Sequence, residues 1–146
     1  MRFIGDFTAK TDVKGRVFLP AAFRKVLEAA GESHLVLRRD LFQPCLVLYP
    51  ESVWNATLDD LKQRLTTYRR EHQNVLRQFV ADAEPVELDS NGRFLIGKQK
   101  LEFAGITSDV RFLAVDERIE VWNKEALDRL IEESDSLGDT LESLLG

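Results

Sequence analysis

The residue types best suited to chemistry lie in one short pattern that occurs twice, as Asp12-Val13-Lys14-Gly15-Arg16 and as Asp89-Ser90-Asn91-Gly92-Arg93. In each copy the aspartate can close a turn by accepting hydrogen bonds from the backbone amides after it, and the glycine can supply a positive φ. The arginine then leaves a rigid turn with a guanidinium suited to a carboxylate, a phosphate or a guanine edge. The pattern predicts a turn-forming role for Asp12, Gly15, Asp89 and Gly92, and for the arginines it leaves an Asp–Arg scaffold pair and a recognition role both open.

The similarity extends beyond the two turns and indicates an internal duplication. Both copies continue into three apolar residues, and the same offset of 77 residues aligns Leu35–Leu37 with Phe112–Ala114. Further along, Leu46–Tyr49 aligns with Ile119–Trp122 at an offset of 73, so the first copy has a longer connecting loop. Self-similarity of this kind is typical of folds built from repeated units.

Hydrophobic patterning predicts the elements that position the turns. Short strands flank each turn in the pattern of a hairpin, and they cover Phe7–Thr11, Val17–Leu19, Val86–Leu88 and Phe94–Ile96. A helix is expected after each of these units, at 21–30 before Gly31 and at 98–104 before Gly105. More strands are expected at 34–39, 45–49, 110–115 and 118–122. Because such short hairpins cannot bury an apolar face alone, we expect the two halves to form one pseudo-symmetric barrel.

Helical patterns occupy the rest of the chain. Between the copies, apolar residues at spacings of four and three predict a helix from Pro50 through Tyr68, and a second helix is expected over 71–80. The tail from Lys124 is also helical in pattern, with an interruption expected at Gly138. The chain is therefore divided into residues 1–50 (first repeat), 51–80 (helical insert), 81–123 (second repeat) and 124–146 (acidic tail).

Composition is that of a soluble protein with an uneven charge. Hydrophobic residues make up 44% and charged residues 31%, and the net charge is −5. Residues 1–40 carry eight lysines and arginines against five acids, whereas residues 123–146 carry two against seven. A basic region can coexist with an acidic tail in a DNA-binding protein, because only the contacting face must be positive. No apolar run is long enough for a membrane span or a signal peptide, so a cytoplasmic location is expected.

No residues have the spacing of a metal or catalytic site. His34 and His72 lack neighbouring cysteines or histidines, and the lone Cys45 is predicted to be a small buried apolar residue. We expect no metal, no cofactor, no small-molecule substrate and no enzymatic activity.

Taken together, these motifs resemble the MraZ family over residues 3–124. Besides the two turns, the resemblance rests on Phe3–Gly5, Cys45–Pro50, Phe103–Ile106 and Glu120–Trp122. It implies an α+β fold, namely a tandem swapped-hairpin (double-ψ-like, AbrB-like) β-barrel made of two pseudo-repeats with flanking helices.

The resemblance also implies a function, that of a sequence-specific, DNA-binding transcriptional regulator associated with the nucleoid. Its implied target is a set of direct repeats in the promoter of the cell-division and cell-wall gene cluster. Its implied assembly is a homo-oligomeric ring of about eight subunits. A ring presents many identical turns, so neighbouring sites on DNA are expected roughly 10 bp apart.

Residue roles follow from this resemblance. Arg16 is expected to contact a base, guanine above all, while Lys14 and Lys10 contact phosphates. Arg24 is expected to bind phosphate or to brace Asp12.

The second copy departs from the family's pattern. Gly97 stands where the family has a proline, and Lys100-Leu101 stands where the next helix carries an arginine. The first copy is therefore expected to carry most of the DNA contact, and for Arg93 a scaffold role and a DNA contact are both open.

Two other functions compete with DNA binding. The first is an antitoxin-like protein–protein interaction module on the same fold, which would use the acidic tail or the helical insert and need no basic face. The second is an enzyme on a duplicated barrel, which the missing catalytic residues disfavour.

Overall fold

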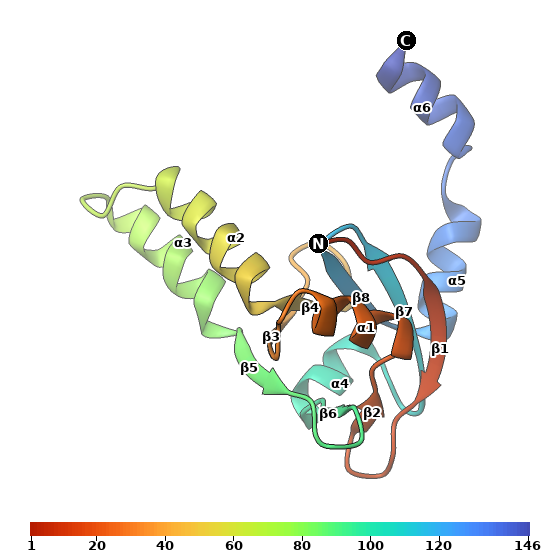
Figure 1. The fold of residues 1–146 in the computed structure, drawn as a ribbon. Helices are drawn as coiled ribbons and strands as arrows, with labels where there is room; N and C mark the ends of the chain where they lie inside the picture. Colours follow the sequence, from red (N-terminus) through yellow and green to blue (C-terminus); the bar gives the residue numbers. More distant parts are fainter.

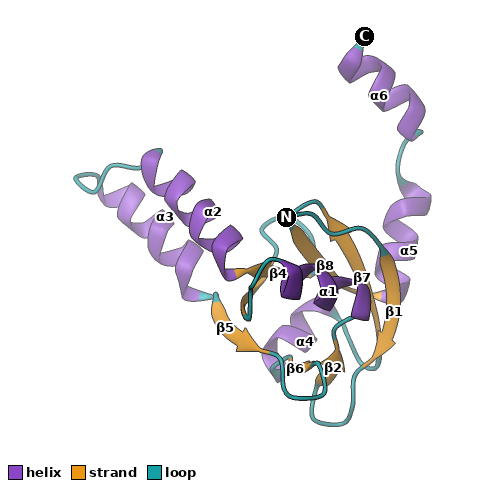
Figure 2. Ribbon diagram, in the orientation of Figure 1, coloured by secondary structure: helices purple, strands orange, loops and turns teal.

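The computed structural model describes residues 1–146 as a mixed α+β protein, which confirms the predicted fold class (Figure 2). Its strands are β1 (Asp6–Lys10), β2 (Arg16–Phe18), β3 (His34–Arg39), β4 (Leu46–Pro50), β5 (Glu84–Glu87), β6 (Arg93–Leu95), β7 (Asp109–Val115) and β8 (Arg118–Asn123). Its helices are α1 (Ala21–Ala29), α2 (Glu51–Gln63), α3 (Arg70–Ala81), α4 (Lys98–Ala104), α5 (Lys124–Glu133) and α6 (Leu137–Leu145).

The strands of the two copies interleave. Six of them form an antiparallel sheet in the order β1-β7-β8-β4-β3-β5, and β2 and β6 form a separate two-stranded ribbon. β1 pairs with β7 as β5 pairs with β3, while β8 and β4 meet at the centre of the sheet. Equivalent strands therefore occupy equivalent positions, and the ribbon takes one strand from each copy (Figure 1).

The local hairpin predicted across each turn is wrong. β1 pairs with β7 and β2 pairs with β6, so the two strands that flank a turn separate. The first turn is still closed, because the amide of Asp12 donates to the carbonyl of Arg16 at 2.9 Å. Beyond that bond each short strand takes its partner from the other copy, since a hairpin of two short strands is too small to be stable alone.

A closed barrel is not confirmed by the strand pairing. β1 and β5 are the free edges of the six-stranded sheet, and no ladder joins them to the ribbon. The sheet and the ribbon nevertheless share one core, to which both copies contribute. Its most deeply buried side chains include Val17, Phe23, Leu37, Phe94 and Phe112. Each half therefore depends on the other for burial.

The face of the sheet that points away from this core is covered by helices in two places. α2 and α3 form a helical hairpin that projects from one side of the molecule (Figure 1). Trp54 at its base stacks on Phe79 with ring centroids 5.3 Å apart. α5 covers the other end of this face, where Leu127 packs with Cys45 and Trp122. Cys45 is fully buried, which confirms that prediction.

The helix predicted from Pro50 through Tyr68 is too long. α2 ends at Gln63, and Tyr68 lies in the connecting loop with 98% of its surface exposed. The amide of Thr66 donates to Nδ1 of His72 at 2.9 Å, a bond that holds the loop against the start of α3. The apolar spacing continues past the helix end, so periodicity alone did not reveal the boundary.

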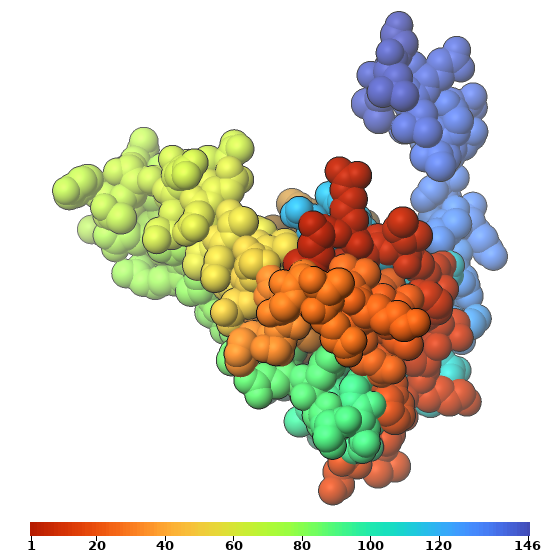
Figure 3. Space-filling view, in the orientation of Figure 1, coloured from red at the N-terminus to blue at the C-terminus, as the bar shows by residue number.

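The tail consists of two helices with a break at residues 134–136. The predicted interruption at Gly138 is displaced, because Ser136 is the N-cap of α6 and accepts a hydrogen bond from the amide of Asp139. α6 stands clear of the sheet and of the helical hairpin (Figures 1 and 3). No helix of the protein has the length and apolar character needed to cross a membrane.

Candidate nucleic-acid interface

The first Asp-x-x-Gly-Arg turn is built around the carboxylate of Asp12. One oxygen, Oδ1, accepts the backbone amides of Lys14 and Arg16, both at 2.9 Å. The other, Oδ2, accepts Nε of Arg16 at 2.7 Å. Gly15 has φ +91°, and a Cβ there would lie 2.5 Å from the carbonyl oxygen of Ile96. The turn therefore requires both the aspartate and the glycine.

The second turn repeats this geometry. Oδ1 of Asp89 accepts the amides of Asn91 and Arg93 at 2.9 Å, and Oδ2 accepts Nε of Arg93 at 3.0 Å. Gly92 has φ +84° and lies against the guanidinium of Arg24. In both turns the aspartate thus accepts two backbone amides and the glycine has a positive φ.

Both aspartates are held in the charged form. The amide of Arg16 lowers the pKa of Asp12 most strongly, the side chain of Arg16 and the amide of Lys14 lower it further, and burial acts in the opposite direction; the result is about 2. The amide of Arg93 lowers the pKa of Asp89 in the same way. Each arginine is thus paired with a carboxylate through Nε, while its two terminal nitrogens have no protein acceptor.

The ribbon places the two arginines on one exposed face. Arg16 lies opposite Leu95 and Phe18 lies opposite Arg93, whereas the residues between them point into the core. The guanidinium of Arg93 lies 5.7 Å from the ring of Phe18. Phe18 and Leu95 remain 53% and 54% exposed. The exposure of these two apolar side chains could not be predicted from the sequence, because the alternation of a three-residue strand is too short to show which face is outside.

Arg24 does not brace Asp12. Its Nη1 donates to the carbonyl of Leu19 at 3.0 Å, and its side chain covers Gly92 in the second turn. The reciprocal position in α4 is Leu101, whose Cδ1 would lie 3.2 Å from a Cβ on Gly15. Each turn is therefore backed by the helix of the other copy, with an arginine behind the second turn and a leucine behind the first.

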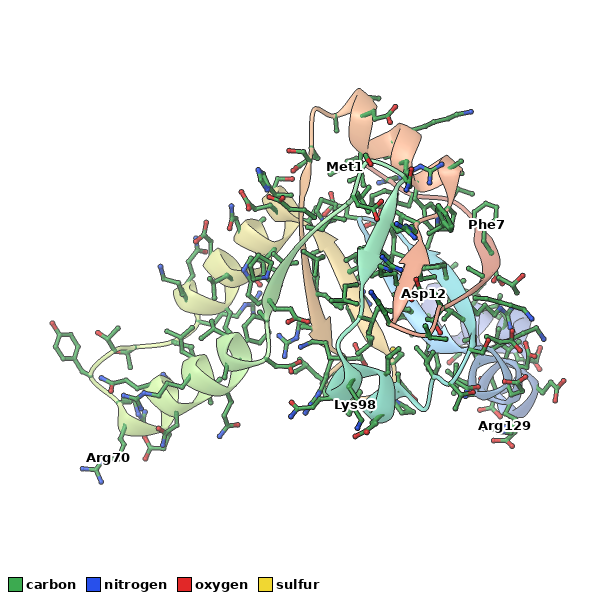
Figure 4. The ribbon with its side chains drawn as sticks, turned by 90° about the horizontal axis from the view of Figure 1, so that it is seen from below. Met1, Phe7, Asp12, Arg70, Lys98 and Arg129 are labelled. Atoms are coloured by element: carbon green, nitrogen blue, oxygen red, sulfur yellow. The ribbon has the colours of Figure 1, made fainter.

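The two lysines predicted to contact phosphate are both exposed. Lys14 lies within the first turn, and Lys10 ends β1 with its Nζ 3.8 Å from Asp109. The two turns lie side by side at one end of the molecule, well away from the tip of the helical hairpin (Figure 1). Figure 4 shows this separation from below, with Asp12 near the centre and Arg70 at the far end of the hairpin. The first turn thus brings three basic residues close together in the chain, namely Lys10, Lys14 and Arg16.

Two other basic residues of the fold, Lys100 and Arg111, are already paired. Lys100 is mostly buried between Asp82 at 3.5 Å and Glu84 at 3.4 Å, so it serves the scaffold. Arg111 binds Asp6 through two nitrogens, at 2.8 and 2.6 Å, and also pairs with Asp128. This network ties β1, β7 and α5 together. Its members are up to 122 residues apart in sequence, so no local pattern signalled it.

One group of potential metal ligands was not foreseen from sequence. A carboxylate oxygen of Asp40, Sγ of Cys45 and a carboxylate oxygen of Glu120 lie within 4.8 Å of one another. Burial raises the pKa of the Cys45 thiol far above its usual value, and Glu120 already accepts Nε1 of Trp122 at 3.0 Å. A protonated thiol is a poor ligand, and the contacts are those of a packed strand end.

The interleaved α+β fold with two arginine-bearing turns on one ribbon defines a class of small duplicated proteins. A family model described as "MraZ protein, putative antitoxin-like" matches residues 3–77 and 79–145. A transcriptional regulator MraZ of Bacteroides fragilis is 50% identical over 145 residues, which cover 99% of this chain and 92% of that protein. Another of that name, from Phocaeicola vulgatus, is 51% identical over 146 residues, which cover 100% and 95%. The chain belongs to the MraZ family, which confirms the resemblance.

Proposed function

We propose that this protein is a transcriptional regulator that binds double-stranded DNA through the β2–β6 ribbon and its two turns. The observation that carries the proposal is the pairing of each aspartate with the Nε of its arginine, which leaves the terminal nitrogens of both partly exposed arginines without a protein acceptor. The names of the relatives support the regulatory role. A regulator of this kind works in the cytoplasm at the nucleoid and is not an enzyme.

In the proposed complex the first turn reads the sequence. A two-stranded ribbon fits the major groove, where an arginine can bond to O6 and N7 of guanine through two nitrogens. The ion pair with Asp12 fixes the direction of the Arg16 guanidinium before DNA arrives, so less side-chain entropy is lost on binding. Lys14 and Lys10 then neutralise phosphates and make affinity depend on salt.

Arg93 and Arg24 have supporting roles in this scheme. Arg93 packs against Phe18 and pairs with Asp89, so it extends the charged face of the ribbon while remaining part of the scaffold. Arg24 is next to the second turn, where its charge is available to a phosphate that approaches Gly92.

The finer features of the proposal concern assembly and target. We propose that the interleaved pairing of β1 with β7, β5 with β3 and β2 with β6 is a tandem swapped-hairpin arrangement. Copies of the chain are proposed to form a ring of about eight subunits, related head to tail. Such a ring would bind direct repeats roughly 10 bp apart, in the promoter of the cell-division and cell-wall gene cluster.

Fluorescence anisotropy tests this function. A labelled duplex from upstream of the protein's own operon is titrated across a salt series with wild type, Arg16→Ala and the matched control Arg70→Ala, which removes an exposed arginine far from the turns. Wild type and the control are expected to bind with the same steep salt dependence, and Arg16→Ala is expected to lose most of its affinity while light scattering shows an unchanged assembly. Equal binding of wild type to random DNA would contradict the proposal.

A protein–protein interaction module remains the second candidate, and one observation favours it. Phe18 and Leu95 are each more than half exposed on the same ribbon, and exposed apolar side chains next to arginines are common at protein interfaces. In that case Phe18→Ser would abolish partner binding and leave DNA affinity unchanged.

A further inference from the structure

A second charged surface lies on the outer face of the six-stranded sheet, beside the base of the α2–α3 hairpin. There a cavity of about 180 Å³ is lined by Arg38, Arg39, Arg118 and Tyr49 and bounded by the loop Asp40–Phe42. We call this cavity, with its loop, the arginine groove. It lies far from the two turns in sequence and in the sheet, so DNA binding through the ribbon does not account for it.

Arg38 is the buried charged residue of the protein, with 4% of its surface exposed. Its Nε donates to the carbonyl of Arg39 at 3.0 Å, and its guanidinium carbon lies 4.2 Å from the ring centroid of Phe79. Nη1 is also buried but has no acceptor. A cation–π contact offsets only part of the cost of desolvating a guanidinium, so Arg38 leaves a poorly compensated positive charge beside the cavity.

The nearby carboxylates are engaged elsewhere. Asp40 accepts the amides of Phe42 and Gln43 at 3.1 and 2.9 Å. Glu120 binds Trp122 and remains 4.0 Å from Arg118. Asp82 accepts the amide of Arg39 at 2.6 Å and pairs with Lys100 as well as with the Arg39 guanidinium. The guanidinium of Arg39 is already neutralised, because its Nε lies 3.5 Å from Asp82 and its guanidinium carbon lies 5.2 Å from the ring centroid of Phe103. Arg38 and Arg118 therefore face carboxylates that already have other partners, and the groove favours a further anionic group.

The rim of the groove is apolar as well as charged. Leu41 is 60% exposed and Phe42 is 88% exposed, although both could have been polar at no cost to the core. A ligand that satisfies both the rim and the arginines must combine carboxylates with apolar side chains. An acidic amphipathic helix has this chemistry.

The C-terminal helix α6 has the complementary character. Leu137, Leu141 and Leu144 recur at helical spacing along one face and are all exposed. The chain carries five acids after Arg129 and no lysine or arginine there; the acids are Glu132, Glu133, Asp135, Asp139 and Glu142. A helix with an exposed leucine stripe and acidic flanks is expected to find a basic, apolar partner surface.

We propose that α6 of one copy docks in the arginine groove of a second copy, with its leucines on Leu41 and Phe42 and its carboxylates toward the accessible guanidinium of Arg118. A second copy is favoured because α5 is anchored on β7 and β8 by Leu127 and by the Arg111–Asp128 pair. From that anchor α6 is directed away from its own sheet (Figure 1). The contact joins different surfaces of the two copies, so it links them head to tail.

Disulfide trapping in the full-length protein without DNA tests this proposal, and its failure would leave the DNA-binding proposal untouched. Phe42→Cys in one copy and Leu141→Cys in a larger tagged copy are mixed, each with Cys45→Ala, and mildly oxidised. Cross-linking between the two sizes is expected about tenfold above that of the control pair Tyr68→Cys and Leu141→Cys, because docking raises the effective concentration of the two thiols. Yields equal to the control overturn the proposal. A disulfide confined to single chains that carry both substitutions also overturns it.

Charge variants test the role of the arginines. Adding Arg118→Glu to the Phe42→Cys copy is expected to lower the cross-link yield about tenfold, and Arg118→Lys is expected to retain most of it. Arg118 is partly exposed, so circular dichroism should show an unchanged fold for both. Yields that do not change with Arg118→Glu would show that the groove does not receive an acidic helix.

Discussion

Replacing Gly15 by alanine tests how tightly the first turn is locked between the two copies. The substitution places a Cβ at φ +91°, which costs about 1–2 kcal/mol of backbone strain. It also puts that atom 2.5 Å from the carbonyl oxygen of Ile96, a backbone atom that cannot rotate away. Overpacking of this kind adds about 1–3 kcal/mol, so the total loss of unfolding free energy is about 3 kcal/mol.

Gly31 provides a matched control. Its φ is +69°, but a Cβ there would have no heavy atom within 4 Å, so only the backbone strain of about 1 kcal/mol is expected. For a chain of this size each kcal/mol shifts Tm by about 2–4 °C. Calorimetry at fixed protein concentration should thus show Gly15→Ala melting roughly 10 °C below wild type and Gly31→Ala roughly 3 °C below. Equal shifts for the two variants would refute the close approach of the turn to Ile96.

Three further perturbations follow from the same structure. Because the pKa of Asp12 is lowered from 3.8 to about 2, its ion pair stabilises the fold above about pH 4 and that stability is lost as pH falls toward 2; Asp12→Asn should remove this part of the acid-unfolding curve, and an unchanged curve would count against it. Phe23→Ala empties a fully buried position against Phe3 and Phe7 and should cost about 3–5 kcal/mol in a single cooperative urea transition, whereas two separate transitions would show that the copies fold independently. Lys14→Ala should lower the slope of log affinity against log salt by about 0.9 and leave sequence preference intact, and a changed preference would place Lys14 at a base.

Local patterns predicted most of the elements, because turn residues and apolar alternation act over a few residues. The two turns were predicted in detail, since an aspartate that accepts two amides and a glycine with positive φ are fixed by chain chemistry. The end of α2 at Gln63 was not predicted, because Leu65 continues the apolar helical spacing beyond the last residue of the helix.

Partners from the other copy were beyond local prediction. β1 finds β7 about a hundred residues away, and nothing in either strand specifies that pairing over a hairpin with β2. The same interleaving places Arg24 of the first copy behind the second turn and Leu101 of the second copy behind the first turn. The arginine groove was also missed, since Arg38, Arg118 and Tyr49 meet only when three strands are in register.

Arg16→Lys gives the most direct test of the central claim that the first turn reads DNA through a guanidinium. Lysine keeps the positive charge but cannot bond to guanine through two planar nitrogens. The measurement is the ratio of affinities for the upstream operator duplex and a random duplex at one salt concentration. We expect this ratio to fall about ten- to a hundredfold while random-duplex affinity is retained. A ratio equal to that of wild type would contradict the account, because the guanidinium of Arg16 would then have no part in recognition.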